Sequence, residues 1–290
     1  MTAVVEELQA AETGALVHPS FWRRSQASPT LLAGTLITGA IATVAILAPV
    51  IAPYPPDRQD LFHVLSGVSS THLLGTDELG RDVLSRLLFA ARTDLKVGVL
   101  AVVFPLCFGT LAGTLAGYYG GLLDSIVMRI VDVVIAFPFY VLVIGLVFVV
   151  GTGTRGIYVG FAIADWVVYA RTVRAATLVV READYIAAAR AGGIGDVRLL
   201  ARHVLPNTVT QAIVYVINDV VLVIVAVVTL GYLGLGIQPP TADWGAMIAD
   251  GQEFLTTHWM LATVPGLAVV LTGLGLSLIG DGLADVLRPR

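Results

Sequence analysis

Few side chains in this sequence have the types and spacing that catalysis or metal binding would need. The one cysteine, Cys107, lies in an uncharged stretch, and the five histidines are scattered, with none close to another His or Cys at metal-ligand spacing. The glycines of GTDELGRD, residues 75–82, are not followed by the Gly-Lys-Ser/Thr of a phosphate-binding Walker sequence, which the whole sequence lacks. The sequence therefore predicts a chain without catalytic residues and without a metal site.

Two acidic residues are unusual because each lies inside a long apolar stretch. An ionisable group in a membrane span is costly and usually faces the interior of a helix bundle or a water-filled cavity. Asp165 and Asp219, with Asn218 beside the latter, are therefore predicted to line a translocation pathway. The alternative is structural, with Arg171 pairing with Asp165 and Asn218 sharing contacts with Asp219. Use of Asp219 as a proton relay would instead indicate a secondary transporter.

Other charged and aromatic residues are expected to have structural roles. Arg129 and Asp132 are three positions apart, so on a helix they share one face and can pair. Asp124 lies near the start of the same expected helix, where a carboxylate interacts favourably with the helix dipole. Trp244 and Trp259 flank the start of the last apolar stretch and are expected to lie at the membrane interface.

The most charged stretch in the second half of the chain, residues 181–207, reads READYIAAARAGGIGDVRLLARHVLPN. Its alanines are strong helix formers, and the glycines at 192, 193 and 195 should end that helix. Asp196 is a good N-cap for a second helix over 197–204, and Pro206 marks the start of the next apolar stretch. A short helix turned sharply by glycines is suited to a groove of another protein, whereas an amphipathic loop on lipid headgroups is the alternative.

The elements that position these residues are predicted to be membrane-spanning helices. Of the 290 residues, 57% are hydrophobic and only 13% are charged, against about 25% charged in soluble chains. A span needs about 20 mostly apolar residues, and continuous apolar stretches indicate helices rather than alternating strands. The predicted fold is all-α and polytopic, with a tail over 1–30 and a membrane domain over 31–290. The six expected spans are about 31–52, 96–119, 124–150, 156–180, 206–234 and 257–280.

The distribution of basic residues predicts the orientation of these spans. Six spans place both termini on one side, and Lys and Arg are more numerous on that side, which predicts cytoplasmic termini and a cytoplasmic 181–205 loop. The first thirty residues carry acidic side chains and no apolar core, so a polar tail is expected rather than a cleaved signal. The net charge of −4 excludes a nucleic-acid binder built on a basic surface.

Proline and small residues predict how the spans bend and pack. Pro105, Pro138 and Pro265 lie inside three of the expected spans and should kink them. Small residues at 112, 113, 116 and 117 share a helical face and favour close approach of a second helix, although composition alone would also explain them.

The 181–207 stretch resembles the EAA loop of binding-protein-dependent ABC importer permeases. The two alanines, the loop glycine and the H-x-L-P ending of that pattern correspond to Ala188, Ala189, Gly193 and residues 203–206. The family glutamate is replaced by Ala187, and Asp184 or Glu182 is a candidate substitute for its carboxylate. The resemblance implies a coupling helix that docks on an ATPase subunit. The residues it assigns to this coupling are Asp184, Ala187, Ala188, Ala189, Arg190, Gly193, His203 and Pro206.

Four further segments, at 71–98, 116–138, 230–252 and 278–290, are similar to the C-type permease of the dipeptide, oligopeptide and nickel group. A glutamate that this group carries in the fifth span is Val227 here. The resemblance implies the type I ABC importer permease fold in a bacterial inner membrane. It also implies as partners a second permease subunit, two subunits that bind ATP and Mg, and an extracytoplasmic solute-binding protein, for which residues 238–253 are a candidate contact.

Peptides are the expected cargo by this resemblance, with nickel, glutathione or haem as alternatives in the same group. Three other function classes compete with an ABC permease. A secondary transporter would use Asp132, Asp165 or Asp219 as ion sites, a channel would pass solute down its gradient, and a membrane scaffold would move no solute. Only the ABC permease requires the 181–205 loop to work with a separate ATPase, so substitution of Gly193 separates it from the others.

Overall fold

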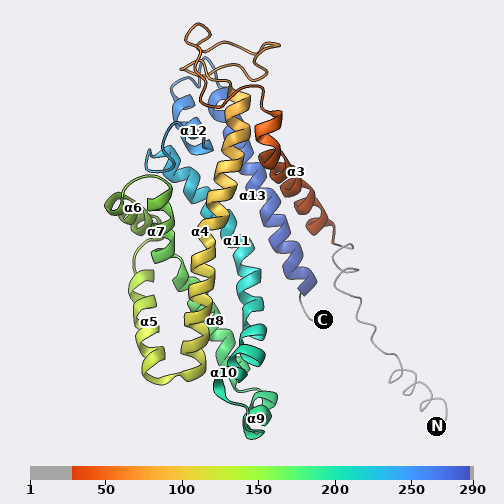
Figure 1. Cartoon of the computed structure of the whole chain (residues 1–290), viewed down its shortest axis with the longest axis vertical. Helices are drawn as coiled ribbons and strands as arrows, with labels where there is room; N and C mark the ends of the chain where they lie inside the picture. The colour runs from red at the N-terminus through yellow and green to blue at the C-terminus, as the bar shows by residue number, and fades with distance from the viewer. Residues whose placement is uncertain (1–27, 288–290) are drawn as a thin grey trace, which may run out of the picture.

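The computed structural model describes residues 28–287, and every named element in that range is a helix (Figure 1). Most of the predicted tail and the basic residues Arg288 and Arg290 lie outside the described residues. The helices are α3 (Pro29–Ile51), α4 (Val83–Tyr119), α5 (Gly121–Ile135), α6 (Phe139–Val150), α7 (Thr154–Ala164), α8 (Trp166–Arg181), α9 (Asp184–Ala191), α10 (Asp196–Leu199), the π-helical turn η1 (Leu200–Val204), α11 (Leu205–Tyr232), α12 (Trp244–Gln252) and α13 (Met260–Leu287).

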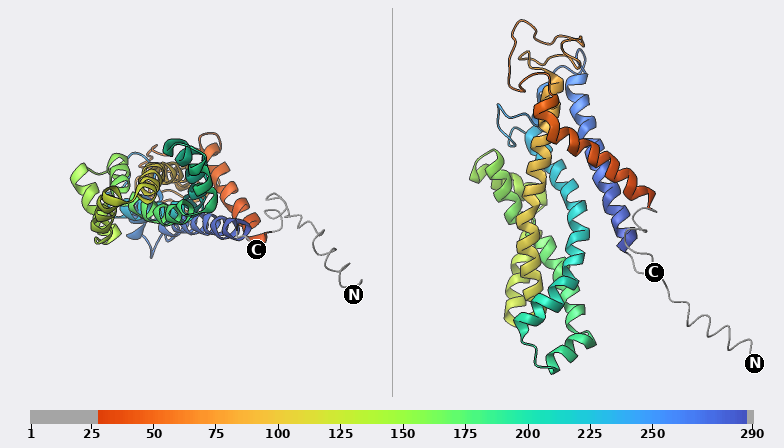
Figure 2. Two further views of the ribbon diagram at one scale, coloured as in Figure 1. Left: turned by 90° about the horizontal axis from the view of Figure 1, so that it is seen from below. Right: turned by 45° about the vertical axis from the view of Figure 1, so that its right-hand side comes forward.

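The helices run back and forth along an elongated bundle, whose two ends are called upper and lower as drawn in Figure 1. Helix α3 rises to the upper end, where residues 53–82 form an irregular segment, and α4 descends the whole bundle. Helix α5 rises again, α6 and α7 fold against the flank, and α8 descends to α9 and α10 at the lower end. Helix α11 returns upward, α12 lies near the upper end, and α13 descends beside α3 (Figure 2).

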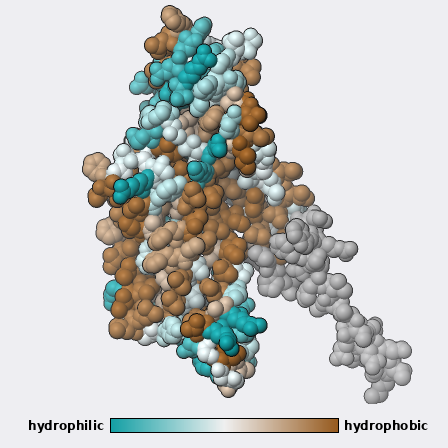
Figure 3. All heavy atoms as spheres, viewed as in Figure 1, coloured by the Kyte–Doolittle hydropathy of each residue, from teal (hydrophilic) through white to brown (hydrophobic). Residues whose placement is uncertain are grey.

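Helix length and hydropathy confirm an all-α polytopic membrane protein. Four helical stretches are long and apolar enough to cross a membrane, namely α3, α4, Asp196–Tyr232 and α13. Helices α5 and α6 qualify together as a fifth crossing with a bend of 91°. Figure 3 shows apolar side chains over the middle of the bundle and polar side chains near its ends. Helices α7 and α8 are each shorter than a span, so the count of six stays a prediction.

Helix α4 begins at Val83, well before the expected second span at about residue 96. Its first turns can carry charged side chains because those side chains have partners. Asp82 caps the helix by accepting a 2.8 Å hydrogen bond from the backbone N–H of Ser85. Arg86 pairs with Asp77 and Asp250, so this charge is not left unpaired in the buried surface of the bundle. The polar connection expected between the first two spans is therefore partly an extension of α4.

Only one of the three predicted proline kinks ends a helix. Pro138 lies at the break between α5 and α6, where its ring disfavours helical backbone at the preceding residue. Helices α4 and α13 continue through Pro105 and Pro265. A second break, between α7 and α8, falls at Asp165, and no proline causes it.

Helices α4 and α8 pack closely along a row of glycines, which confirms the predicted close approach. Gly109, Gly113 and Gly117 recur every four residues and so lie on one face of α4. A methyl group added at Gly113 would collide with the backbone of Ala170, and one at Gly117 would lie 2.8 Å from the Cβ of Thr177. The backbones of α4 and α8 therefore meet where no side chain fits between them.

At the upper end, a buried ionic cluster ties residues 53–82 to α4 and α12. Asp77 accepts from Nε of Arg81 at 2.7 Å and also pairs with Arg86, while Asp250 of α12 lies 3.3 Å from Nη2 of Arg86. Arg81 further reaches Glu78 at 2.6 Å, and burial raises the pKa of that glutamate. The cluster, made of Asp77, Glu78, Arg81, Arg86 and Asp250, holds the irregular segment against two helices.

The expectation that Trp244 anchors the membrane interface is wrong. Its side chain is 1% exposed, and its indole Nε1 donates a 3.3 Å hydrogen bond to the carbonyl oxygen of Leu87. Trp244 begins α12, and this start is wedged between α4 and α11, so the indole fills the core instead. Trp259, which precedes α13, is 57% exposed, as an interfacial residue would be.

Candidate functional site

The lower end of the bundle carries the 181–205 loop, and its backbone follows the predicted order of helix, glycine break and helix. Helix α9 ends in a Schellman motif, in which Gly193 donates to the carbonyl of Arg190 at 3.0 Å and Ile194 to that of Ala189 at 3.2 Å. Gly193 has φ of +81°, a left-handed conformation that glycine adopts without strain. The sharp turn between α9 and α10 therefore depends on this glycine.

The second helix differs from the expectation in two ways. Asp196 lies inside the first turn of α10 and Gly195 is the cap residue, because the Asp196 carboxylate is bonded to another helix. The helix also does not stop at residue 204, but continues through η1 into α11 as one stretch, Asp196–Tyr232. The π-turn just before Pro206 accommodates a proline that lacks an N–H and whose ring crowds the preceding turn.

An apolar cluster fixes the loop against the end of α4. Ile186 of α9, Leu199 of α10 and Val204 of η1 are completely buried, and they pack with Tyr118 and Leu200. Burying side chains of this size stabilises a contact by about 1.5–3 kcal/mol each. The inner side of the loop is therefore part of the folded core rather than a free surface strand.

Tyr118, at the end of α4, is the polar centre of this contact. Its hydroxyl donates a 2.7 Å hydrogen bond to Oδ1 of Asp196, and Nη2 of Arg190 donates to the same hydroxyl at 3.4 Å. The Arg190 guanidinium also lies over the Tyr118 ring, 5.8 Å from its centroid. Hydrogen bonding to the Tyr118 hydroxyl raises the pKa of Arg190, so this side chain stays charged. One tyrosine thus joins α4 to both helices of the loop.

Arg181 supplies a second link between α4 and the loop. Its Nη1 donates to the carbonyl oxygens of Gly117 at 2.9 Å and Tyr118 at 3.4 Å, and its Nε donates to Oε1 of Glu182 at 2.9 Å. The last carbonyls of a helix have no partner within the helix and favour a nearby cation. Arg181 therefore caps α4 from the beginning of the loop.

The outer side of the loop is free for a partner. Asp184, Ala187 and Ala188 share the exposed side of α9, and Val197 of α10 is 78% exposed. Arg190 is exposed although it contacts Tyr118. The remaining predicted coupling residues do not join this face, since Ala189 and His203 are half-buried, Pro206 is exposed at the base of α11, and Gly193 is exposed at the turn.

The position of the missing family glutamate faces away from the bundle, because Ala187 is exposed. Of the two candidate substitutes, Glu182 already pairs with Arg181, whereas Asp184 is exposed in the first turn of α9. The sequence pattern did not single out Tyr118, Arg181 or Asp196 as partners across this contact. The sequence feature that points to this contact is the aromatic pair before the two glycines at 120 and 121. This pair lies in a segment that resembles the family, but the resemblance assigns it no role.

The predicted pathway residues occupy two separate places. Asp165 and Asp219 are 4% and 3% exposed, and Tyr169 donates a 2.6 Å hydrogen bond to Oδ2 of Asp219. The ring of Tyr215 packs edge-on against Tyr169, 5.0 Å between centroids. Asn218 instead lies against Gly280 of α13. Asp219 therefore has a partner within the chain, whereas the buried Oδ2 of Asp165 has none among the described residues. The lining of an assembled pathway by both aspartates stays a prediction.

Two predicted ion pairs are replaced by others. Arg171 binds Asp132 of α5 at 2.6 Å and not Asp165, and Asp132 is thereby paired with α8 rather than with Arg129 on its own helix. Asp124 is held by Arg174 through two hydrogen bonds, one of 2.6 Å from Nη2 to Oδ2. Both pairs join α5 to α8, so these charges meet across two packed helices and not along one helix.

Comparisons with known proteins show which family the chain is similar to. A sequence model of the family described as "Binding-protein-dependent transport system inner membrane component" matches residues 109–290, and one described as "N-terminal TM domain of oligopeptide transport permease C" matches residues 20–66. The chain is 40% identical, over 93% of its length and 89% of the relative, to the glutathione transport system permease proteins GsiD of Escherichia coli strain 536 and Shigella boydii. It is 37% identical to the di/tripeptide transport system permease protein DppC of Pseudomonas aeruginosa, over 97% and 96% of the two chains.

Proposed function

The chain belongs to the family of binding-protein-dependent transport system inner membrane components, and on that premise we propose that it forms one half of the translocation pathway of an ATP-driven importer of short peptides. Permeases of this family work with ATPase and substrate-binding partners. We propose the full assembly as this chain, a second permease subunit, two ATPase subunits that hold ATP and Mg, and an extracytoplasmic binding protein. The chain itself acts as a non-catalytic subunit in a bacterial inner membrane.

The observation that carries the proposal is the two-sided loop at the lower end. Its inner side is locked to α4 by the buried Ile186 and Leu199 and by Tyr118, while its outer side exposes Asp184, Ala187 and Val197. A loop held rigidly on one side can receive motion from a partner on the other without unfolding. Closure of an ATPase dimer would move this loop and thereby bias the spans between two arrangements with opposite access.

The proposed orientation follows from the same assignment. If the 181–205 loop meets a cytoplasmic ATPase, the lower end is cytoplasmic and the upper end faces the binding protein. The surplus of Lys and Arg on the side of the loop supports this orientation. Both chain termini belong to the same side in a six-span arrangement.

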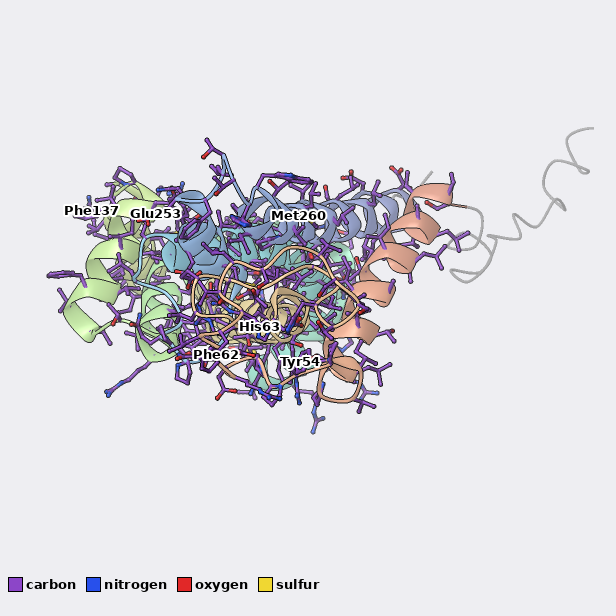
Figure 4. The ribbon with its side chains drawn as sticks, turned by 90° about the horizontal axis from the view of Figure 1, so that it is seen from above. Tyr54, Phe62, His63, Phe137, Glu253 and Met260 are labelled. Carbon is purple, nitrogen blue, oxygen red and sulfur yellow. The ribbon has the colours of Figure 1, made fainter. Side chains whose placement is uncertain are left out.

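Docking of the binding protein fits residues 53–82 better than residues 238–253. Much of the latter segment, including Trp244 and Met247, is buried in the bundle. The upper segment instead exposes Leu61, Phe62 and Leu73, with Phe62 97% exposed. Figure 4 looks down on this end and shows Phe62 and His63 on the loop that crosses the helix ends. Contiguous exposed apolar patches typically mark a protein interface, and these three side chains lie on one segment.

The cargo is proposed to be short peptides, and glutathione is the second candidate because it is itself a small peptide. Both are named in the relatives, which transport di- and tripeptides in one case and glutathione in the other. Nickel and haem remain the alternatives within the group. Uptake by the reconstituted complex, measured with labelled dipeptides, longer peptides, glutathione, nickel and haem at equal concentrations, distinguishes these cargoes.

Co-purification in mild detergent tests the function itself. We expect an ATPase with a Walker sequence to remain bound to the chain. In proteoliposomes, we expect cargo uptake only when ATP is present on the side of the membrane that carries the ATPase. A matched complex with the Walker lysine of the ATPase replaced should bind equally and transport nothing. A chain that stays alone in detergent, or uptake driven by an ion gradient without ATP, would overturn the proposal in favour of a secondary transporter that uses Asp165 or Asp219.

A further inference from the structure

Helix α4 contacts both the 181–205 loop and the ionic cluster of the upper end. It runs without a break for 37 residues, which at 1.5 Å per residue is about 55 Å. The helix is therefore long enough to extend past both faces of a hydrocarbon layer about 30 Å thick. The two ends of α4 make polar contacts with residues that are distant in the sequence. These contacts hold each end more firmly than apolar packing alone would.

At the lower end, Tyr118 makes the fixed contact. The hydroxyl joins Asp196, 78 residues later in the chain, and the ring supports Arg190. A hydrogen bond to an ionised carboxylate is about twice as strong as one between neutral groups. The neighbouring Tyr119 is half exposed and its ring only packs edge-on against Tyr118. The two adjacent tyrosines thus differ in that one holds the loop and the other does not.

Along its length, α4 is joined to α8 by the glycine row of Gly109, Gly113 and Gly117. Helix α8 leads directly into the loop at Arg181, whose guanidinium returns to cap α4. Two helices in backbone contact slide or bend less easily than helices separated by flexible side chains. Helices α4 and α8 and the loop are therefore joined by continuous contacts.

At the upper end, the first turns of α4 hold α12 by two independent contacts. The backbone N–H of Trp244 donates to Oδ2 of Asp94 at 2.9 Å, and Nη2 of Arg86 reaches Oδ2 of Asp250 at 3.3 Å. Asp94 and Arg86 are almost completely buried, so the Asp94 contact is shielded from water, whereas Asp250 is 38% exposed. A displacement of α4 along or about its axis would therefore be imposed on α12 and on residues 53–82.

We propose that α4 is a rigid connector that transmits movement of the 181–205 loop to α12 and the upper segment, and that Tyr118 is the positioning residue that fixes the loop to it. The inference rests on the proposed function, since it assumes that an ATPase moves the loop. It adds to that function a specific route, by which nucleotide binding at one end changes the surface that receives the binding protein at the other.

The first test compares Tyr118→Phe with the matched control Tyr119→Phe in the full reconstituted complex. Both variants keep the aromatic ring, and only the former loses the bond to Asp196. For Tyr118→Phe we expect unchanged assembly, a thermal midpoint lower by only a few degrees, and about tenfold less cargo moved per ATP hydrolysed, the factor set by loss of one charge-assisted hydrogen bond. Tyr119→Phe should match the wild type. Equal coupling ratios in the two variants would overturn the proposal.

The second test reports movement directly. In a Cys107→Ser background the chain has no cysteine, so single spin labels can be placed at Ser70→Cys in the upper segment and at Ala201→Cys in the loop, both at exposed positions. ATP and Mg with a hydrolysis-deficient ATPase should change the spectra of both labels. Adding Tyr118→Phe should abolish the change at residue 70 and preserve the change at residue 201.

If both labels still respond to ATP in the Tyr118→Phe variant, the proposed role of α4 as a connector is contradicted, because the upper end would then move without the Tyr118 contact. Absence of any ATP-dependent change in the unsubstituted tyrosine background, or failure of the ATPase to bind, would instead contradict the proposed function. Asp250→Asn gives a check at the far end, with exposed Glu253→Gln as its control. Only Asp250→Asn should abolish the ATP-dependent change at residue 70 while the change at residue 201 is preserved.

Discussion

The backbone amide of Trp244 donates a 2.9 Å hydrogen bond to the carboxylate of Asp94, across 150 residues of chain. Next to it, Asp243 caps α12 by accepting from the amide of Ala246 at 3.1 Å. Two buried acidic residues therefore hold the start of α12 between α4 and α11. The stability of the upper end therefore depends on the charge of these two groups.

Substitution of Asp243 by Asn should remove a pH-dependent loss of stability. Burial raises the pKa of Asp243 to about 6 from its model-compound value of 3.8. The folded protein therefore holds the proton more tightly, and stability falls as pH rises from about 4 to 6, by about 3 kcal/mol in all. The facing groups are Asp94 and Arg86 from α4 and Asp250 from α12. Asn retains the cap.

The measurement is thermal unfolding of the purified chain in detergent between pH 4 and pH 7. The midpoint of Asp243→Asn should rise relative to that of the wild type across this range. Parallel curves for the two proteins would show that Asp243 does not titrate in this window.

Gly193→Val should uncouple ATP hydrolysis from transport. The residue has φ of +81° and open space around it, so the cost comes from the backbone and not from a collision. A left-handed β-branched residue costs roughly 1–3 kcal/mol, enough to displace α9 from α10. Gly195→Ala is the matched control, because Gly195 has an ordinary φ of −67° and equally open surroundings.

The readout for Gly193→Val is cargo uptake per ATP hydrolysed, with Gly193→Asn as an intermediate because Asn tolerates the left-handed region. The expected order of coupling is wild type and Gly195→Ala highest, then Asn, then Val. Full coupling in Gly193→Val would mean that the turn does not need its observed conformation.

Gly113→Ala should destabilise the chain by about 1–3 kcal/mol through overpacking. The added methyl would meet the backbone of Ala170, which cannot move aside as a flexible side chain can. Gly145→Ala in α6 has no atoms within 4 Å and should be neutral or slightly stabilising. Thermal unfolding in detergent compares the two, and equal midpoints would mean that α4 and α8 separate easily.

Asp219→Asn should leave transport dependent on ATP and independent of an ion gradient. In the unsubstituted chain Tyr169 donates a 2.6 Å hydrogen bond to Asp219, and the carbonyl oxygen of Asn can still accept it. Uptake in proteoliposomes with and without an imposed proton gradient measures the dependence. A gradient-driven component that disappears in Asp219→Asn would support the secondary-transporter alternative.

Phe62→Ser should weaken binding of the extracytoplasmic partner about tenfold, because large apolar anchors carry much of the energy of an interface. Leu122→Ser, at an apolar residue of the lower end that is 77% exposed, is the control. Binding of the purified solute-binding protein to the complex in nanodiscs gives both affinities. If Phe62→Ser changes only the association of the chain with lipid, the upper segment is a membrane anchor instead.

Composition and local pattern determined much of this protein before any contact was known. Long apolar stretches predict helices because a backbone in lipid must satisfy its own hydrogen bonds. Gly193 predicts a sharp turn because few other residues adopt its backbone conformation. These inferences succeeded because each depends on residues close together in the sequence. Pro138 gave a break for the same reason.

Tertiary structure decided which charges meet and which aromatic residues are buried. Spacing along one helix suggested that Asp132 pairs with Arg129, but packing of α5 on α8 brings Arg171 to it. Trp244 has the position of an interfacial anchor in the sequence, yet the start of α12 is inserted between α4 and α11. No local pattern in the sequence indicates that the Tyr118 hydroxyl binds Asp196, 78 residues later in the chain. A local pattern fixes what an element can be, whereas its partners depend on how distant elements pack, because contact energies are summed over the whole bundle.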